Sequence, residues 1–380
     1  MSAEAWKFYI EYWDPYPTYT SVLYTGKILS FSGQAGRVSY MDQYNGGGFS
    51  LTIINDNDEA AQFVRGRYVS IRFADNQVFM GGRVVGIDFQ DAPGTDQGVS
   101  LAVITCSDPV GQCGKANLNS FSFAQALTST QATLPNGTFG TNIIPTVNAT
   151  SSSSTASAST YSGSFLNKLN LLSNTEKGQI WPDGTKSLYF LNRKDVAQSS
   201  GYSLTRNGAA IYDIQYSGFD RIQLGDQFMN QVFVEPETVA TQFGSNQSSI
   251  DTYGPAGYSI STLDYNTTQA SGLASWLSTM QGDPNDYRYE VTTNDLVAND
   301  TNLKNWLLQL KLGKSLIELK WLKPGSGSDS VLNVVCEGFT VNAVPKLNTY
   351  TFYLSAVTTY QYFILNSSTF GILNTSRLGW

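Results

Sequence analysis

The sequence predicts a mainly β fold with a small α+β insertion, and three observations favour this class. Charged residues make up only 14% of the 380 residues, far fewer than the surface of a helical bundle carries. Aromatic residues make up 13%, including 22 Tyr and 20 Phe, which strands favour. Short apolar runs recur between turns rich in Gly, Pro and Asn. The aromatic content and a net charge of only −7 also argue against a disordered chain.

Residues 1–108 are predicted to form a first β-barrel module. The clearest run is 67–73, in which Val69, Ile71 and Phe73 share one face while polar side chains share the other. No helical pattern separates the strands, and this spacing is typical of a closed barrel or a sandwich. The predicted strands are 6–10, 23–31, 49–54, 67–73, 78–89 and 99–106.

Residues 109–164 are predicted to be a loop or linker, because the Ser/Thr-rich tract 150–160 has little apolar area to bury. The region 165–294 follows as an α+β middle part. Its apolar spacing predicts short helices at 165–172 and 270–280. Between them we expect a hairpin turn at 180–185 and strands at 187–191, 211–214 and 231–234.

Residues 295–356 are predicted to form a second β-rich module, which can include strands from about residue 209. The predicted strands are 288–292, 303–312, 315–321, 331–344 and 349–356, with a hairpin loop at 324–329. The last segment, 357–380, is apolar in patches, and from residue 363 onward it carries one charge, Arg377. We expect this segment to dock on another surface, with the assembly contacts made by Phe363, Phe370, Leu373, Leu378 and Trp380.

No catalytic, cofactor-binding or metal site is predicted. The chain has no His and only three Cys, which disfavours His-assisted nucleophiles and four-thiolate metal sites. Paired carboxylates are the remaining candidates for acid–base chemistry. Each pair lies in a polar turn, where acidic residues are favoured for local hydrogen bonding. The pairs are Asp56 with Asp58, Asp283 with Asp286, and Glu235 with Glu237.

Charge and hydropathy restrict location and partners. No stretch approaches membrane-spanning length, and the first ten residues lack the pattern of a secretory signal, so synthesis in a cytoplasm is expected. The 23 basic residues are outnumbered by 30 acidic ones. Because phosphate affinity depends on Lys and Arg, we expect no tight binding of duplex DNA.

In four segments the chain resembles the minor tail and baseplate hub proteins of long-tailed, in particular non-contractile, bacteriophages. The order of the segments along one chain carries the resemblance, and the C-terminal one is the most distinctive. The matching residues are 24–31, 36–37, 50–55, 63–71 and 81–87 in the first segment, 169–193 in the second, 230–234, 248–254 and 270–277 in the third, and 370–380 in the fourth.

The resemblance implies a structural, non-enzymatic protein of the virion tail tip, without cofactors and assembled in the host bacterial cytoplasm. It would form the baseplate hub ring that joins the tail tube to the tip and surrounds the DNA path. Two tail-tube-like β-barrel modules per chain would let a homotrimer match a six-membered tube ring. The implied partners are a tail-tube or distal tail ring protein, tip or fibre proteins and a tape-measure protein. Low charge agrees with extensive subunit contacts.

Three other interpretations remain open on the sequence. One is a hexameric distal tail ring protein, which the prediction of two barrels disfavours. The others are a tail-tip protein that hydrolyses glycans and one that only binds them. Both need aromatic and acidic residues gathered in one cleft, whereas the seven Trp and 22 Tyr are spread along the chain.

Overall fold

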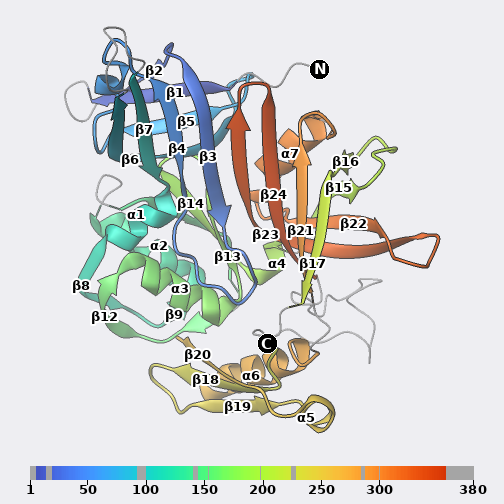
Figure 1. Ribbon diagram of the computed structural model, residues 1–380. Coiled ribbons are helices and arrows are strands. Elements are labelled where there is room, and N and C mark those ends of the chain that lie inside the picture. Colours follow the sequence, from blue (N-terminus) through green and yellow to red (C-terminus); the bar gives the residue numbers. More distant parts are fainter. Residues whose placement is uncertain are drawn as a thin grey trace.

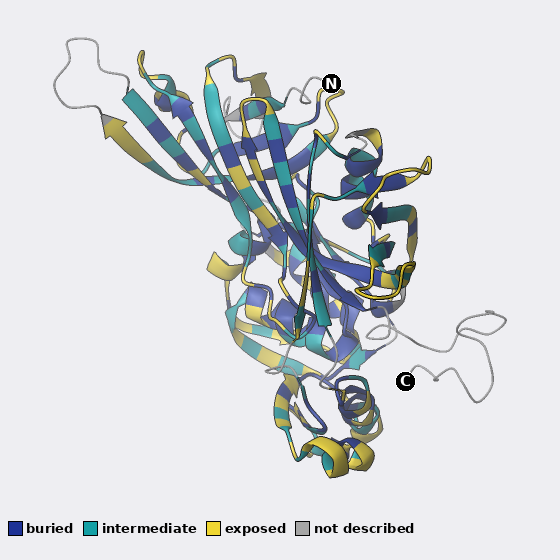
Figure 2. Cartoon of the chain, turned by 45° about the vertical axis from the view of Figure 1, so that its right-hand side comes forward, coloured by how far each residue is buried: buried dark blue, intermediate teal, exposed yellow. Residues whose placement is uncertain are grey.

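The protein is mainly β with a smaller α+β part, as the sequence predicts (Figure 1). Its largest element is a sheet of 14 strands. Buried and more exposed residues alternate along several of these strands (Figure 2), which is the period-two pattern of a strand with one buried face. The computed structural model describes residues 6–13, 19–91, 100–139, 144–152, 154–196, 198–223, 228–283, 287–298 and 300–356.

The first module is a curved, antiparallel half of this sheet, in the order β2-β1-β5-β6-β7-β4-β3. The ring of Trp6 lies 5.0 Å from the ring of Phe79 and 5.2 Å from that of Phe31, so the curved sheet encloses a barrel-like aromatic core. The elements are β1 (Lys7–Trp13), β2 (Tyr19–Leu23), β3 (Ile28–Gly36), β4 (Gly48–Ile54), the 3-10 helix η1 (Glu59–Gln62), β5 (Tyr68–Arg72), β6 (Val78–Asp91) and β7 (Ser100–Ser107).

The second module is the other half of the large sheet, in the order β17-β21-β24-β23-β22-β15-β16. Strands that precede residue 209 join it, because β15 pairs with β22 in parallel. Helix α7 lies between β21 and β22 in the chain. The elements are α4 (Arg193–Val196), β15 (Ser199–Thr205), β16 (Asp213–Gln215), β17 (Gly218–Gln223), β21 (Tyr287–Asn294), α7 (Asp300–Leu310), β22 (Leu316–Leu322), β23 (Asp329–Val344) and β24 (Leu347–Ala356).

The strand predicted at 303–312 is wrong, because residues 303–310 belong to helix α7 and a turn follows. Leu303, Trp306, Leu307 and Leu310 are buried, and their spacing of three and four residues places them on one helix face. The ring of Trp306 lies 4.4 Å from that of Phe352 on β24. A short apolar run alone does not separate a strand from a buried helix, which is the reason for the error.

The two modules have the same strand order and matching register. The order β3-β4-β7-β6-β5 in the first corresponds to β17-β21-β24-β23-β22 in the second. The β6–β7 ladder shifts register between Val84 and Gly86, and the β23–β24 ladder shifts between Cys336 and Gly338. Aligning these two irregularities makes other pairs equivalent: Val69 with Ile317, Ile71 with Leu319, Leu51 with Val291 and Phe31 with Phe219.

The described residues between 109 and 164 form helices and strands, which corrects the predicted loop or linker. Ser152, Ser154, Ala156 and Ser157 of the Ser-rich tract are buried, because the backbone there finds internal hydrogen-bond partners. The amide of Ser129 donates to Ser152 Oγ at 3.0 Å, and the amide of Ser154 donates to Glu176 Oε2 at 3.0 Å. The elements are α1 (Pro109–Lys115), β8 (Asn117–Phe123), β9 (Ala126–Leu127), α2 (Thr128–Phe139), β10 (Thr146–Ala149), β11 (Thr155–Ala156) and β12 (Ser159–Ser164).

The helices predicted at 165–172 and 270–280 are confirmed, as is the hairpin between them. The first helix packs with the hairpin under the first module, and the second packs on a separate three-stranded sheet at the lower end of the molecule (Figure 1). The elements are α3 (Phe165–Glu176), β13 (Gln179–Pro182), β14 (Ser187–Leu191), β18 (Gln231–Pro236), β19 (Gln242–Ser245), α5 (Gln247–Tyr253), β20 (Gly257–Thr262) and α6 (Thr267–Met280).

Candidate assembly site

The two modules are joined edge to edge by β3 and β23, which lie side by side in Figure 1. Their antiparallel register runs from Gly36 opposite Gly338 to Phe31 opposite Ala343. A Cβ atom on Gly36 would lie 2.3 Å from the carbonyl oxygen of Glu337, and the φ angle of Gly36 is +79°. A Cβ atom on Gly338 would lie 2.4 Å from the carbonyl oxygen of Arg37. The seam therefore requires glycine at both positions.

A buried ion pair lies at the end of this seam. Arg37 Nε donates to Glu337 Oε2 at 3.0 Å, and their side chains are 5% and 0% exposed. Gln179 Nε2, on β13 of the middle region, donates to the same carboxylate oxygen at 3.2 Å. The amide of Arg37 also donates to the carbonyl oxygen of Glu337 at 3.0 Å. One carboxylate thus holds the first module, the second module and the middle region together.

Further cations and aromatic rings surround the pair. The guanidinium carbon of Arg37 lies 5.2 Å from the ring centre of Tyr40 and 4.9 Å from that of Tyr44. Lys177, the C-cap residue of α3, is buried nearby with its Nζ 5.4 Å from the Tyr40 ring. Burial, with a smaller contribution from the charge of Arg37, lowers the pKa of Lys177 to about 7. Glu337 is therefore a buried carboxylate close to two basic side chains, Arg37 and Lys177.

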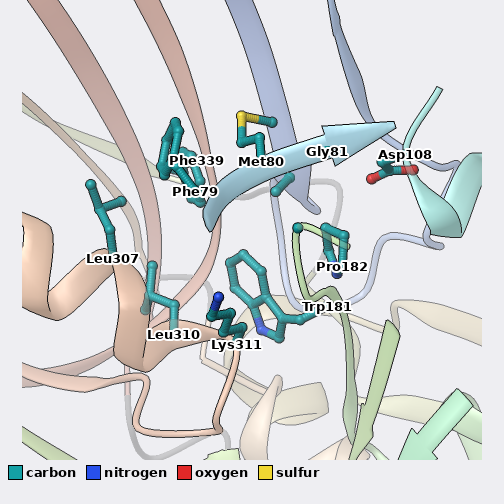
Figure 3. A pocket seen from close by; sticks show the side chains of 12 residues that line it. Phe79, Met80, Gly81, Asp108, Trp181, Pro182, Leu307, Leu310, Lys311 and Phe339 are labelled. Carbon is teal, nitrogen blue, oxygen red and sulfur yellow. The ribbon is translucent and has the colours of Figure 1, made fainter. Parts of the chain in front are cut away.

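An aromatic stack lies beside the ion pair and is shown in Figure 3. The ring of Phe339 on β23 stacks with Phe79 of β6 at 5.8 Å and with Trp181 of β13 at 6.2 Å. Lys311 Nζ donates to the carbonyl oxygens of Val78 and Asp183 at 3.3 and 3.1 Å. The cavity among these side chains offers about 20 Å³ to the centre of a water molecule, which is room for one or two waters. Its size fits packing between modules and excludes an organic ligand.

Asp108 lies on the wall of the same cavity and connects β7 to α1. It is the N-cap of α1, and its Oδ1 accepts from the amide of Gly111 at 2.7 Å and from that of Gly47 at 3.1 Å. Burial raises the pKa of this carboxyl to about 6, although the amide hydrogen bonds act in the opposite direction. Its role is to fix the loop before β4 against the start of α1.

The described members of the carboxylate pairs considered on the sequence lie in exposed positions. Asp56 accepts from the amide of Ser100 in an exposed turn, and Asp58 adopts a left-handed turn conformation with a φ of +60°. Glu235 and Glu237 are exposed, and Asp283 is exposed as well. Asp286 lies outside the described residues, as do Phe363, Phe370, Leu373, Leu378 and Trp380.

Two findings apply to the described part of the chain. It holds no group of three or more His, Cys, Asp or Glu side chains placed to bind a metal ion. None of its helices is long and apolar enough to cross a membrane.

Arg37 lies in the first segment of the resemblance, whereas the sequence did not single out Glu337 or Gly338. The repeat of the two modules marks the position of Gly338. Each module has one long strand that contains a glycine directly after the ladder irregularity, Gly86 in β6 and Gly338 in β23. The partner of Glu337 is 300 residues away, and no local pattern gives such a distance.

Comparison with known proteins gives the fold a precedent. No protein-family model and no curated protein matches the chain. Among solved structures, the 43 kDa tail protein of prophage MuSo2 from Shewanella oneidensis is 11% identical with a TM-score of 0.60, covering 94% of this chain and 98% of that one. A tail protein from Neisseria meningitidis MC58 is 10% identical with a TM-score of 0.61, covering 93% and 96%.

A third structure is an Escherichia coli component of the type VI secretion system, described as similar to the T4 bacteriophage tail proteins gp27 and gp5. It is 10% identical with a TM-score of 0.50, covering 87% of this chain and 74% of that one. At such identities the likeness concerns the fold. The chain has, over nearly its whole length, the fold of solved phage tail proteins.

Proposed function

We propose that the protein is a structural component of a phage tail tip and forms the baseplate hub ring between tail tube and tip. The ring is a homotrimer that surrounds the DNA path. It contacts the tail-tube or distal tail ring protein on one side and tip or fibre proteins on the other, and the tape-measure protein within. The protein has no enzymatic role and works at the virion tail tip after assembly in the host bacterial cytoplasm.

The observation that carries this proposal is the pair of modules with matching order and register in one chain. A tube ring of six subunits presents six similar docking surfaces. Two equivalent modules per chain let three copies present the same number, so that a ring with threefold symmetry matches a ring with sixfold symmetry. The tail proteins of Shewanella and Neisseria, which share the fold over more than nine tenths of the chain, support a tail component.

The domain arrangement belongs to the same proposal. The module from 1–108 and the module built around 295–356 with β15–β17 would face the tube. The middle region, held to the first module through Asn170 and Tyr44 and to the second through Gln179 and Trp181, would act as the buttress that keeps the modules at one angle. A ring that bears mechanical force needs such a fixed angle between its modules.

The test is the stoichiometry of the assembly. Mass photometry of the purified protein is expected to give a particle of three times the 41.5 kDa chain, and averaged electron micrographs are expected to show a ring with threefold symmetry. A ring of six copies would instead support the hexameric distal tail ring. A protein that stays monomeric at all accessible concentrations would contradict a hub ring that assembles on its own.

The C-terminal segment 357–380 is proposed to contribute to assembly through Phe363, Phe370, Leu373, Leu378 and Trp380. Burying large apolar side chains contributes about 1.5–3 kcal/mol each before the cost of ordering them. A chain ending at Tyr360 is therefore expected to assemble less well than the full chain. Unchanged ring formation and incorporation into virions would show that the segment is dispensable.

A further inference from the structure

We propose that neighbouring copies of the chain join through β17 of one copy and β6 of the next, in the register that β3 and β23 use within one chain. This inference rests on the ring proposed above and names the strands that close it. It follows from the equivalence of the two modules. Among the residues that the structure describes, the edge of β3 is paired and the equivalent edge of β17 is open, whereas the edge of β23 is paired and the equivalent edge of β6 is open.

The first open edge is the second half of β6. Its equivalent, β23, pairs with β24 along one side. On its other side β23 pairs first with β22, over 329–335, and then with β3, over 338–343. Strand β6 likewise pairs with β7 on one side and with β5 over 78–83 on the other. In the described part of the chain no strand continues beside 86–91, where the equivalent of β3 would lie.

The second open edge belongs to β17. Its equivalent in the first module, β3, pairs with β4 on one side and with β23 on the other. Within the described residues β17 pairs with β21 only. An open strand edge presents backbone donors and acceptors that a second chain can use. Each copy therefore carries one edge of the β3 type and one edge of the β23 type.

Exposure of equivalent side chains supports this pairing. Val341 on β23, which lies in the occupied seam opposite Gly33, is 2% exposed. Its equivalent on β6 is Phe89, since Val341 pairs with Tyr350 as Phe89 pairs with Ala102 after the two irregularities are aligned. Phe89 is 57% exposed. The large side chain of Phe89 is thus exposed to solvent, whereas Val341 at the equivalent position is buried where the two modules meet.

The register of the proposed seam follows from the same alignment. Gly33 pairs with Phe49 as Arg221 pairs with Tyr289, so Arg221 is the equivalent of Gly33. Arg221 of one copy then lies opposite Phe89 of the next. The guanidinium of Arg221 already lies 5.3 Å from the ring centre of Tyr287, so a second ring beside it adds a favourable cation–π contact. By the same rule Asp220 lies opposite Gln90.

The arrangement closes into a ring and not a two-fold dimer. The two edges are different, and they lie on opposite sides of the β3–β23 seam (Figure 1). A contact between different edges is head to tail, and it generates a closed ring when the rotation between copies closes. Around such a ring first and second modules alternate, joined in turn by the internal seam and by the proposed one.

Cysteine pairs test this register directly. Directly opposite residues on antiparallel strands have Cα atoms about 4.5–5.5 Å apart, within the range that a disulfide spans. One variant carries Arg221→Cys with Phe89→Cys, and a second carries Asp220→Cys with Gln90→Cys. The control, Arg221→Cys with Gln90→Cys, has the same edges but places the thiols on opposite faces of the sheet. Six strands separate β17 from β6 within one chain, on the order of 30 Å along the sheet, so a disulfide reports on two copies.

The chain is suited to this experiment because its own cysteines are inert. Cys106, Cys113 and Cys336 are buried, and burial raises the pKa of each thiol. After mild oxidation, at least one in-register variant is expected to give covalent dimers and trimers on a denaturing gel, at several times the yield of the control. The ladder is expected to stop at three.

The outcomes separate this inference from the proposed function. If mass photometry shows trimers but the in-register pairs cross-link no better than the control, the strands are wrong and the hub ring stands. If no trimer forms by either method, both fail. As a second measure, Phe89→Asp is expected to reduce the trimer fraction at least tenfold. The matched control is Ile211→Asp, an exposed apolar residue (82%) outside β6 and β17, which is expected to leave the trimer fraction unchanged.

Discussion

Glu337 is the residue on which the junction depends. It is fully buried, it pairs with Arg37, and it accepts a hydrogen bond from Gln179. Removing one member of a buried pair leaves the other charge without compensation, which costs far more than losing an exposed pair. The cluster also holds the buried Lys177, whose pKa is lowered mainly by burial, and the loss of the Glu337 carboxylate would remove a charge that favours the ammonium form of Lys177.

Glu337→Gln is therefore expected to lower the free energy of unfolding by about 3–5 kcal/mol. The matched control is Asp329→Asn, which breaks the pair of Arg206 and Asp329 whose side chains are 43% and 38% exposed, and a change below about 1 kcal/mol is expected there. Urea unfolding followed by tryptophan fluorescence at one protein concentration measures both. Equal losses in the two variants would contradict a special role for Glu337.

Asp108 predicts a dependence of stability on pH. Its folded pKa of about 6 lies above the ordinary value of 3.8, so between these values the folded chain binds more protons than the unfolded chain. Stability therefore falls as the pH rises from about 4 to about 6 and stays lower above. Asp108→Asn keeps an oxygen acceptor for Gly47 and Gly111 and removes the buried charge. It is expected to gain up to about 3 kcal/mol at pH 7.5 and to flatten the pH profile.

The control for this titration is Asp251→Asn on α5, an exposed carboxylate, for which the pH profile of the wild type is expected. Thermal unfolding from pH 4 to pH 8 gives the three profiles. If Asp108→Asn were less stable than the wild type at pH 7.5, the result would contradict this prediction. The charged carboxylate of Asp108 would then be the form that stabilises the contact between the loop and the start of α1.

At the scale of elements, the seam between β3 and β23 sets how the modules sit together. Six residue pairs join these strands, from Gly36 with Gly338 to Phe31 with Ala343. Close approach at one end is possible because both members of that pair lack a Cβ atom. The aromatic stack of Phe79, Phe339 and Trp181 then links the two halves of the sheet with the hairpin of the middle region.

Gly338→Ala is expected to lower the free energy of unfolding by about 1–3 kcal/mol, because the new methyl group would collide with the backbone of Ala35 and Arg37. Gly257→Ala on β20 is the control, since a Cβ atom there meets nothing within 4 Å. Chemical denaturation compares them. A Gly338→Ala protein as stable as the Gly257→Ala protein would show that the seam can open without cost.

At the scale of the whole molecule, charge decides how the protein treats the polymer it is proposed to surround. With 23 basic and 30 acidic residues, the chain lacks the cationic surface that releases counterions from DNA. We expect no binding of a 30-base-pair duplex at micromolar protein in physiological salt, measured by filter binding or fluorescence anisotropy. Micromolar or tighter affinity would contradict a channel that lets DNA slide.

The sequence alone was enough for the class of the fold and for many of its parts. The alternation of Val69, Ile71 and Phe73 with polar residues predicted β5, and apolar runs bounded by turns predicted β6 and β23. Helical spacing predicted α3 and α6. The absence of His and the low charge restricted the chemistry through composition alone. All of these signals are independent of which segments meet in the fold.

Which segments of the chain pair with each other depends on the tertiary structure, because the paired segments are far apart in the sequence. The burial of the Ser-rich tract depends on Glu176, which lies more than twenty residues beyond Ser154 and supplies an acceptor. Helix α7 is a helix because its apolar face meets β24, whereas its short apolar run fits a strand equally well. The seam of β3 with β23 and the ion pair of Arg37 with Glu337 join positions about 300 residues apart. Local propensity carries no information on which strand edges meet, since backbone hydrogen bonds are the same for every residue.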